Sequence, residues 1–160
     1  RDIALSLDHR VFEVFDFLEG VEAGDQTNLA EAARSFVNTQ QRTGMVVVLS
    51  DFYDPAGFRE GLDCLRHHKF EPVVIQLYDR RELDVDMQGE LQLVDCETGG
   101  VREITATPAM MEEYRRVFEE FCSELESYCK GNRIRYFRSP IQQSFEDLVL
   151  EIFRDGGFVD

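Results

Sequence analysis

The sequence predicts an α/β domain in which helices cover the faces of a mainly parallel sheet. Three short apolar runs, at residues 45–49, 72–78 and 134–137, have the composition of buried strands. Helical patterns separate these runs, which indicates right-handed crossovers between parallel strands. The length of 160 residues suits one domain, so residues 1–160 are interpreted as a single unit.

Two helices are predicted before the first strand. Apolar residues recur at helical spacing over residues 11–18, and Gly20 is a suitable C-terminal stop. Thr27 is the candidate N-cap of a second helix over residues 29–37. Phenylalanines of the first helix, such as Phe12, are expected to pack in the core.

The first strand, Met45–Leu49, is the most apolar of the three runs. Its composition is typical of a central strand that is covered on both faces. An open sheet edge of this composition would favour aggregation, and three strands make a small sheet for a doubly wound fold. We therefore expect further strands before Arg1, so that the domain is incomplete at the N-terminus, or a homodimer through strand 45–49.

A third helix is expected over residues 55–68, with Pro55 near its first turn and Asp54 as its cap. A β-hairpin insertion at about residues 88–106 follows the second strand. Its predicted strands, 90–95 and 101–106, flank a Gly-Gly turn.

The last part of the chain begins with Thr107-Pro108, a cap followed by an N1 proline. A long helix with apolar residues at spacings of three and four runs from there to Gly131. After the strand at 134–137, Ser144 is the candidate cap of a final helix that ends near Arg154.

Charge and cysteine content restrict the class of partner. Lys and Arg total 17 and Asp and Glu total 32, so the net charge is 17 − 32 = −15. Such a surface repels phosphate, so neither nucleic acid nor an anionic membrane is expected as a partner. No apolar run is long enough to cross a bilayer. Without CxxC spacing, the cysteines are interpreted as reduced thiols of a cytoplasmic protein. They are Cys64, Cys96, Cys122 and Cys129.

The candidate site is the segment Ser50–Asp54, directly after the first strand. Open α/β sheets place function at the carboxyl ends of their strands. An aspartate there can hold a cation or ligand, or it can only cap the next helix, and both interpretations of Asp51 stay open. Elsewhere, Asp84-Val85-Asp86 is interpreted as a solvated loop and His67-His68 as cations at a helix C-terminus.

Several stretches together resemble the bacterial DUF58 family, which is similar to the von Willebrand factor type A domain. They are residues 24–32 (GDQTNLAEA), 46–54 (VVVLSDFYD) and 93–99 (LVDCETG), in that order along the chain. The resemblance implies a Rossmann-like, three-layer α/β/α fold with a mainly parallel sheet.

The resemblance also implies a degenerate remnant of a metal-ion-dependent adhesion site. Thr27 matches its second element and Asp51 its third, while Ser50, Asp54 and Asn28 would form the rim that binds a partner. The first element, DxSxS, is absent and would belong to an upstream strand. Mg²⁺, which prefers oxygen ligands, is therefore expected in a longer protein but not in this chain alone. Asp25-Gln26 stands where the family has Gly-Gly.

The first functional hypothesis is a protein-interaction module, for which the resemblance implies a MoxR-type AAA+ ATPase as partner. The second is an enzyme for metal-assisted phosphoryl transfer or hydrolysis that uses Asp51 and Asp54. The sequence contains no evident nucleophile–base pair and no Gly-rich phosphate loop, which favours the interaction module.

Overall fold

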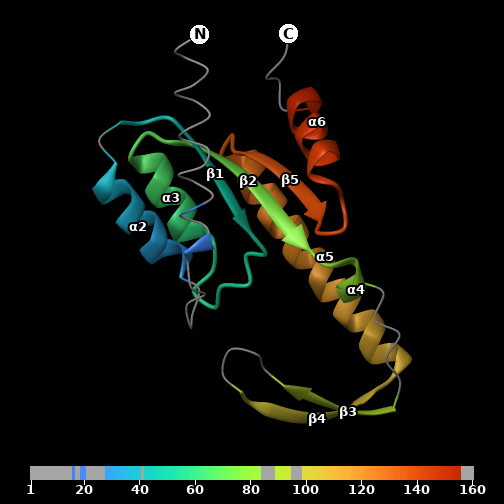
Figure 1. Ribbon diagram of the computed structural model, residues 1–160. Coiled ribbons are helices and arrows are strands. Elements are labelled where there is room, and N and C mark those ends of the chain that lie inside the picture. The colour runs from blue at the N-terminus through green and yellow to red at the C-terminus, as the bar shows by residue number, and fades with distance from the viewer. Residues whose placement is uncertain are drawn as a thin grey trace.

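The computed structural model describes residues 16, 19–20, 28–40, 42–83, 89–94 and 99–155. Within these residues, three parallel strands form one sheet and two antiparallel strands form a separate hairpin (Figure 1). The prediction of a mixed α/β fold with a mainly parallel sheet is confirmed.

Strand order in the described sheet is β1-β2-β5. These strands are β1 (Met45–Ser50), β2 (Glu71–Tyr78) and β5 (Arg135–Pro140). The hairpin consists of β3 (Gly89–Val94) and β4 (Val101–Ala106), as predicted. The helices are α2 (Leu29–Thr39), α3 (Arg59–His67), α4 (Arg80–Leu83), α5 (Pro108–Gly131) and α6 (Phe145–Asp155).

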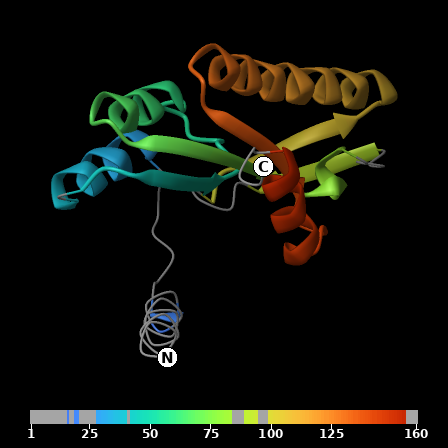
Figure 2. The ribbon, with the colours of Figure 1, turned by 90° about the horizontal axis from the view of Figure 1, so that it is seen from above.

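Helices pack on both faces of the sheet, because alternate strand residues point to opposite sides. On one face, Val74 of β2 belongs to a core cluster with Leu62 of α3 and Leu125 of α5. On the other face, Ile75 belongs to a cluster against which Leu148 of α6 packs. Figure 2 accordingly shows α5 and α6 on opposite sides of the strands.

In the described sheet β2 is central and β1 lies at an edge. Met45, Val47 and Leu49 are 54%, 46% and 60% exposed. They share the α6 side of the sheet, but α6 packs against residues of β2 and β5. We call the side of β1 with no described strand neighbour, together with these three side chains, the open β1 edge. Its coverage by further strands or a second copy stays a prediction.

Helix α2 begins one residue later than its predicted cap implies. Asn28 is the N-cap, and its side-chain oxygen accepts a hydrogen bond from the backbone N–H of Glu31 at 2.8 Å. Thr27 is therefore not the cap, and it lies outside the described residues. The predicted helix over residues 11–18 also lies almost wholly outside them. Near its expected end, the Gly20 N–H donates to the carbonyl oxygen of Asp16 at 3.2 Å.

Helix α3 begins at Arg59, so the prediction that Pro55 occupies its first turn and Asp54 caps it is wrong. The residues between form a turn in which the Gly57 N–H donates to the Asp54 carbonyl at 2.8 Å. The Asp54 carboxylate also accepts from the Ala56 N–H at 2.8 Å. This local side-chain bonding offers the backbone an alternative to helix.

The predicted caps of the last two long helices are confirmed. Thr107 accepts a hydrogen bond from the Met110 N–H at 3.2 Å, and Ser144 accepts from the Asp147 N–H at 3.2 Å. The strand between the helices extends to Pro140, three residues beyond its predicted end.

Only the later part of α5 is buried in the domain. Its buried residues are Phe118, Cys122, Leu125 and Cys129. No residue of Pro108–Val117 is buried, and this first part of the helix extends away from the sheet towards the hairpin (Figure 1). The apolar residues predicted to line the whole length of the helix are therefore core residues in its later part only.

Three of the four cysteines are described, and all three are free thiols: Cys64, Cys122 and Cys129. Burial raises the pKa of the Cys129 thiol to about 12 and that of Cys122 above its ordinary value. Both thiols therefore stay protonated at neutral pH and serve as apolar core groups. Cys96 lies outside the described residues.

Gly61 permits the close approach of α2 and α3. A Cβ atom at this position would lie 2.6 Å from the Leu29 side chain and 2.9 Å from the Leu29 carbonyl oxygen. Alanine gains about 1 kcal/mol over glycine inside a helix, but a displaced helix backbone costs about 1–3 kcal/mol. We expect Gly61→Ala to lower the free energy of unfolding by about 1 kcal/mol in urea titrations.

Gly131 provides the control for this prediction, because a Cβ there would meet open space. Gly131→Ala is expected to leave the urea midpoint unchanged or to raise it slightly. If Gly61→Ala raised the midpoint as much as Gly131→Ala, the close approach of the two helices would be refuted.

Candidate functional site

The loop after β1 is stabilised by hydrogen bonds between its own side chains and its backbone amides. The Ser50 hydroxyl oxygen accepts a hydrogen bond from the Phe52 N–H at 2.9 Å. Phe52 has a φ of 65°, in the left-handed region, which costs a non-glycine residue roughly 1–2 kcal/mol. Its side chain is only 2% exposed and belongs to the main core cluster. Burial of this ring therefore offsets the backbone strain and anchors the loop.

Asp51 lies on the outside of this loop. Its Oδ1 atom accepts a hydrogen bond from the Tyr53 N–H at 3.1 Å, and the residue is exposed to solvent. The carboxylate is thus oriented by its own backbone and directed to solvent. It can meet a cation or a donor group on a partner at the carboxyl end of β1.

Asp54 has a different role, because both of its carboxylate oxygens bind backbone amides. Oδ2 accepts from the Leu29 N–H at 2.7 Å, and Oδ1 accepts from the Ala56 N–H at 2.8 Å. The residue is only 9% exposed. A carboxylate is favourable at a helix N-terminus, so Asp54 ties the start of α2 to the loop after β1.

A shallow hollow of about 420 Å³ connects the start of α2 with the end of β1. Asn28 and Ser50 contribute polar groups to its lining, and Val48 and Leu49 contribute apolar ones. The hollow therefore joins the open β1 edge to two residues of the predicted partner-binding rim.

Tyr53 extends the site towards α4 and α5. Its ring stacks on Phe121 with centroids 5.5 Å apart, and its hydroxyl donates to the Glu82 carboxylate at 3.1 Å. Burial, followed by the charge of Glu82, raises the pKa of Tyr53 above its ordinary value. The phenol therefore remains a neutral hydrogen-bond donor at physiological pH.

The structure brings four of the five predicted site residues to one end of the sheet. Asn28 and Ser50 line the hollow, the exposed Asp51 follows Ser50, and the buried Asp54 binds the amide of Leu29, which also lines the hollow. Thr27, the fifth, lies outside the described residues. Tyr53 and Glu82 were not predicted as site residues. Their signal was weak, since each is only a polar residue that follows an apolar run in the sequence.

The described residues do not form a magnesium site by themselves. Asp54 is poorly placed as a ligand, because it is only 9% exposed and each of its oxygens is directed to a backbone amide. No cluster of three or more His, Cys, Asp and Glu side chains able to hold a metal occurs in the described part of the chain. Asp51 alone supplies one exposed carboxylate, and Mg²⁺ sites usually add waters and further oxygen ligands to one or two carboxylates.

Further predictions concern parts of the chain outside this site. None of the described helices combines the length and the apolar character that crossing a bilayer requires. His67 and His68 lie at the C-terminal end of α3, as predicted, and His68 Nδ1 lies 2.8 Å from the carbonyl oxygen of Cys64. Asp84-Val85-Asp86 lies outside the described residues.

Comparison with known proteins identifies relatives of undetermined function. An uncharacterised protein of Mycobacterium bovis is 29% identical over 110 residues, which are 68% of this chain and 34% of that protein. An uncharacterised protein of Mycobacterium avium is 30% identical over 95 residues, 58% of this chain and 54% of that protein. No solved structure matches the chain.

The chain spans about a third of the length of the first of these relatives. The model of the family described as "Protein of unknown function DUF58" matches residues 9–124, and this range includes both the loop after β1 and the hairpin. The resemblance found in the sequence is thereby confirmed at the level of the family: this chain belongs to DUF58.

Proposed function

We propose that this chain is a protein-interaction module whose partner docks on the open β1 edge and the loop that follows it. One observation carries the proposal: Met45, Val47 and Leu49 expose about half of their surface on a strand that no described strand flanks on one side. Soluble proteins usually protect such edges with charge, proline or a covering segment. An apolar edge of this kind is suited to a binding surface.

The chemistry of this surface favours strand addition. The backbone groups of β1 that no described strand pairs with can bind an extended partner segment, and the three apolar side chains can select it. At the carboxyl end of the strand, the polar rim formed by Asn28, Ser50 and the exposed Asp51 can fix its position. A partner with one extended strand and a few hydrogen-bond donors would pair with the backbone of β1 and with the polar rim.

The resemblance to von Willebrand A-like proteins suggests a MoxR-type AAA+ ATPase as that partner, and free thiols fit a cytoplasmic location. The magnesium ion that the same resemblance implies would need ligands from Thr27 and from outside this chain, so it forms no part of the proposed docking surface. The alternative enzyme hypothesis gains no support, because the Asp54 carboxylate is nearly buried and binds the Leu29 and Ala56 amides.

The experiment compares two leucine variants in their binding to the MoxR-type ATPase of the same organism. Leu49→Asp places a charge on the open β1 edge, whereas Leu150→Asp places the same charge on α6, where Leu150 is 66% exposed. Calorimetric titration should show binding weakened at least about tenfold by Leu49→Asp and unchanged by Leu150→Asp. Circular dichroism checks that both variants remain folded.

Equal binding by Leu49→Asp and the unaltered protein would contradict the proposed surface. Light scattering tests the competing occupant, a second copy of the chain. A dimer of the unaltered protein that dissociates in Leu49→Asp would assign the edge to self-association and overturn the proposal of a different partner.

A further inference from the structure

A second apolar surface lies between the hairpin and the first part of α5. It is a groove of about 540 Å³. Six of its lining residues are apolar or aromatic: Leu91, Leu93, Ile104, Met110, Met111 and Tyr114. None of these residues is buried, and Leu93, Met110 and Tyr114 are 44%, 41% and 40% exposed. The groove is therefore open to solvent although most of its lining is apolar.

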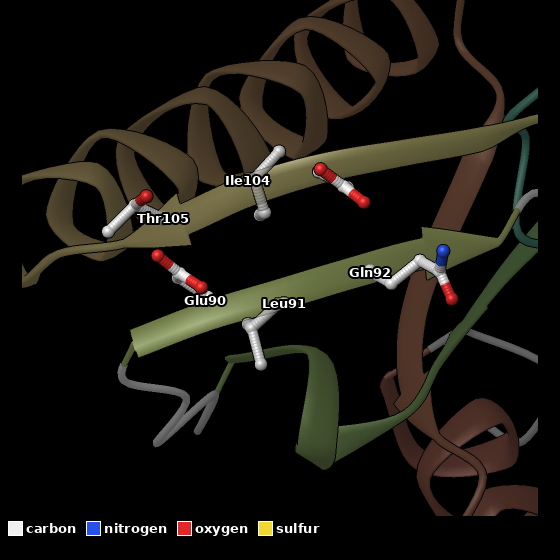
Figure 3. Close-up of a pocket in the computed structure, with 6 residues that line it drawn as sticks. Glu90, Leu91, Gln92, Ile104 and Thr105 are labelled. Carbon is white, nitrogen blue, oxygen red and sulfur yellow. The ribbon is translucent and has the colours of Figure 1, made fainter.

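One face of the hairpin contributes apolar side chains to this groove, and Arg102, paired with Leu93, lies on the same face. Leu91 pairs with Ile104 across the two strands, and both line the groove. The opposite face carries Glu90, Gln92 and Glu103, and Figure 3 shows Leu91 directed away from Glu90. A two-stranded hairpin with a half-exposed apolar face is marginally stable in water, so it gains most from a further covering element.

Three charged residues at the carboxyl end of β2 form one end of the groove: Asp79, Arg81 and Glu82. Arg81 is already paired, since its Nε and Nη2 atoms donate to Asp79 Oδ2 at 2.8 and 2.5 Å. These bonds hold the pKa of Asp79 well below its usual range. Among the described residues, Glu82 accepts a hydrogen bond from the neutral hydroxyl of Tyr53 and forms no ion pair.

We infer that this groove binds an amphipathic helix of a partner protein, with leucine-like side chains on one face and Lys or Arg beside them. The apolar lining would cover the leucine face, and Glu82 would pair with the basic side chain. The net charge of −15 attracts basic partners at long range. The groove is lined by side chains of the hairpin and of α5. An apolar groove of side chains suits a bound helix, whereas strand addition requires the free backbone groups of a sheet edge.

This surface is separate from the open β1 edge, and the inference does not depend on the proposed function. No residue of β1 lines the groove, and no groove residue lines the hollow beside β1. The hydrogen bond from Tyr53 to Glu82 is the described link between the loop after β1 and the groove.

The experiment measures the fluorescence anisotropy of labelled model peptides added to the protein. The first peptide is an amphipathic helix of leucine and lysine. The second has the same composition in scrambled order, and the third carries glutamate in place of lysine. We expect the first peptide to bind at least about tenfold more tightly than either of the others.

Matched variants locate the binding. Leu93→Asp puts a charge into the groove, and Gln92→Asp puts the same charge on the polar face of the same strand. Leu93→Asp should weaken binding at least about tenfold, and Gln92→Asp should not weaken it. Glu82→Gln should weaken binding several-fold and reduce its salt dependence, whereas Glu103→Gln, on the polar face, should change neither.

Equal binding of the amphipathic and scrambled peptides would show general charge attraction only and would overturn the inference. Equal effects of Leu93→Asp and Gln92→Asp would do the same. Leu49→Asp, at the open β1 edge, should retain the peptide affinity of the unaltered protein. A loss of peptide binding in that variant would refute a second, separate surface.

Discussion

Replacing Asp54 with alanine is expected to lower the free energy of unfolding by about 2–4 kcal/mol, because two charge-assisted hydrogen bonds are lost together. The carboxylate accepts from the Leu29 and Ala56 amides at 2.7 and 2.8 Å and is 9% exposed. Its removal leaves two partly buried N–H groups without their acceptor and takes a negative charge from the N-terminus of α2. Equilibrium unfolding in urea measures the change.

Asp51 provides the matched control for this variant. It lies in the same loop and accepts one backbone hydrogen bond, at 3.1 Å, but it is exposed to solvent. Asp51→Ala should cost less than about 1 kcal/mol, because water can replace the lost acceptor. Equal losses in the two variants would show that Asp54 is not the specific tie between α2 and the loop.

Leu62→Ala is expected to cost about 2–5 kcal/mol, the largest effect of any variant considered for this protein. Leu62 is 0% exposed and lies in the cluster that joins α3, α5 and β2. Its side chain packs in the core layer that holds α3 and α5 against β2. The cavity left by the truncated side chain cannot be filled from solvent, so the lost contacts add to the lost hydrophobic transfer energy.

Leu150→Ala makes the same chemical change on α6, where the residue is 66% exposed. Its effect should stay within about 0.5 kcal/mol, since the side chain is mainly in water in the folded protein as well. The difference between the two urea midpoints therefore measures burial at Leu62. Similar midpoints would contradict the core cluster described above.

Much of the fold could be predicted, because its elements have strong local patterns. Helix α5 has a Thr-Pro start and apolar residues at helical spacing, and these features fix its bounds without any tertiary information. The hairpin is similar, since two short alternating runs flank glycines. Each of these signals lies within one segment of the chain.

The role of Asp54 could not be predicted, because it depends on a contact between distant residues. Asp54 precedes α3 in the sequence and has the composition of its cap, yet its carboxylate binds the amide of Leu29, 25 residues earlier. The helix that receives this bond is α2. A sequence pattern gives the capping ability of an aspartate but not the helix that it caps.

The exposure of β1 also could not be predicted from the sequence. Composition alone indicated a strand covered on both faces, whereas Met45, Val47 and Leu49 of β1 are about half exposed on one face. The groove beside the hairpin was missed for the same reason, since it requires β3, β4 and α5 to meet in space. The alternation of Leu91 and Leu93 with polar residues, together with Met110 and Met111, was the available signal.

The uneven burial of α5 has a mechanical consequence. The helix is fixed to the domain from Phe118 onwards, while the stretch Pro108–Val117, about 15 Å long at 1.5 Å per residue, has no buried residue. An α-helix resists bending over such a length, so a force on the hairpin acts on the anchored part through a lever arm. Any load that the hairpin transmits to this stretch would therefore act on Phe118, the first buried residue of α5.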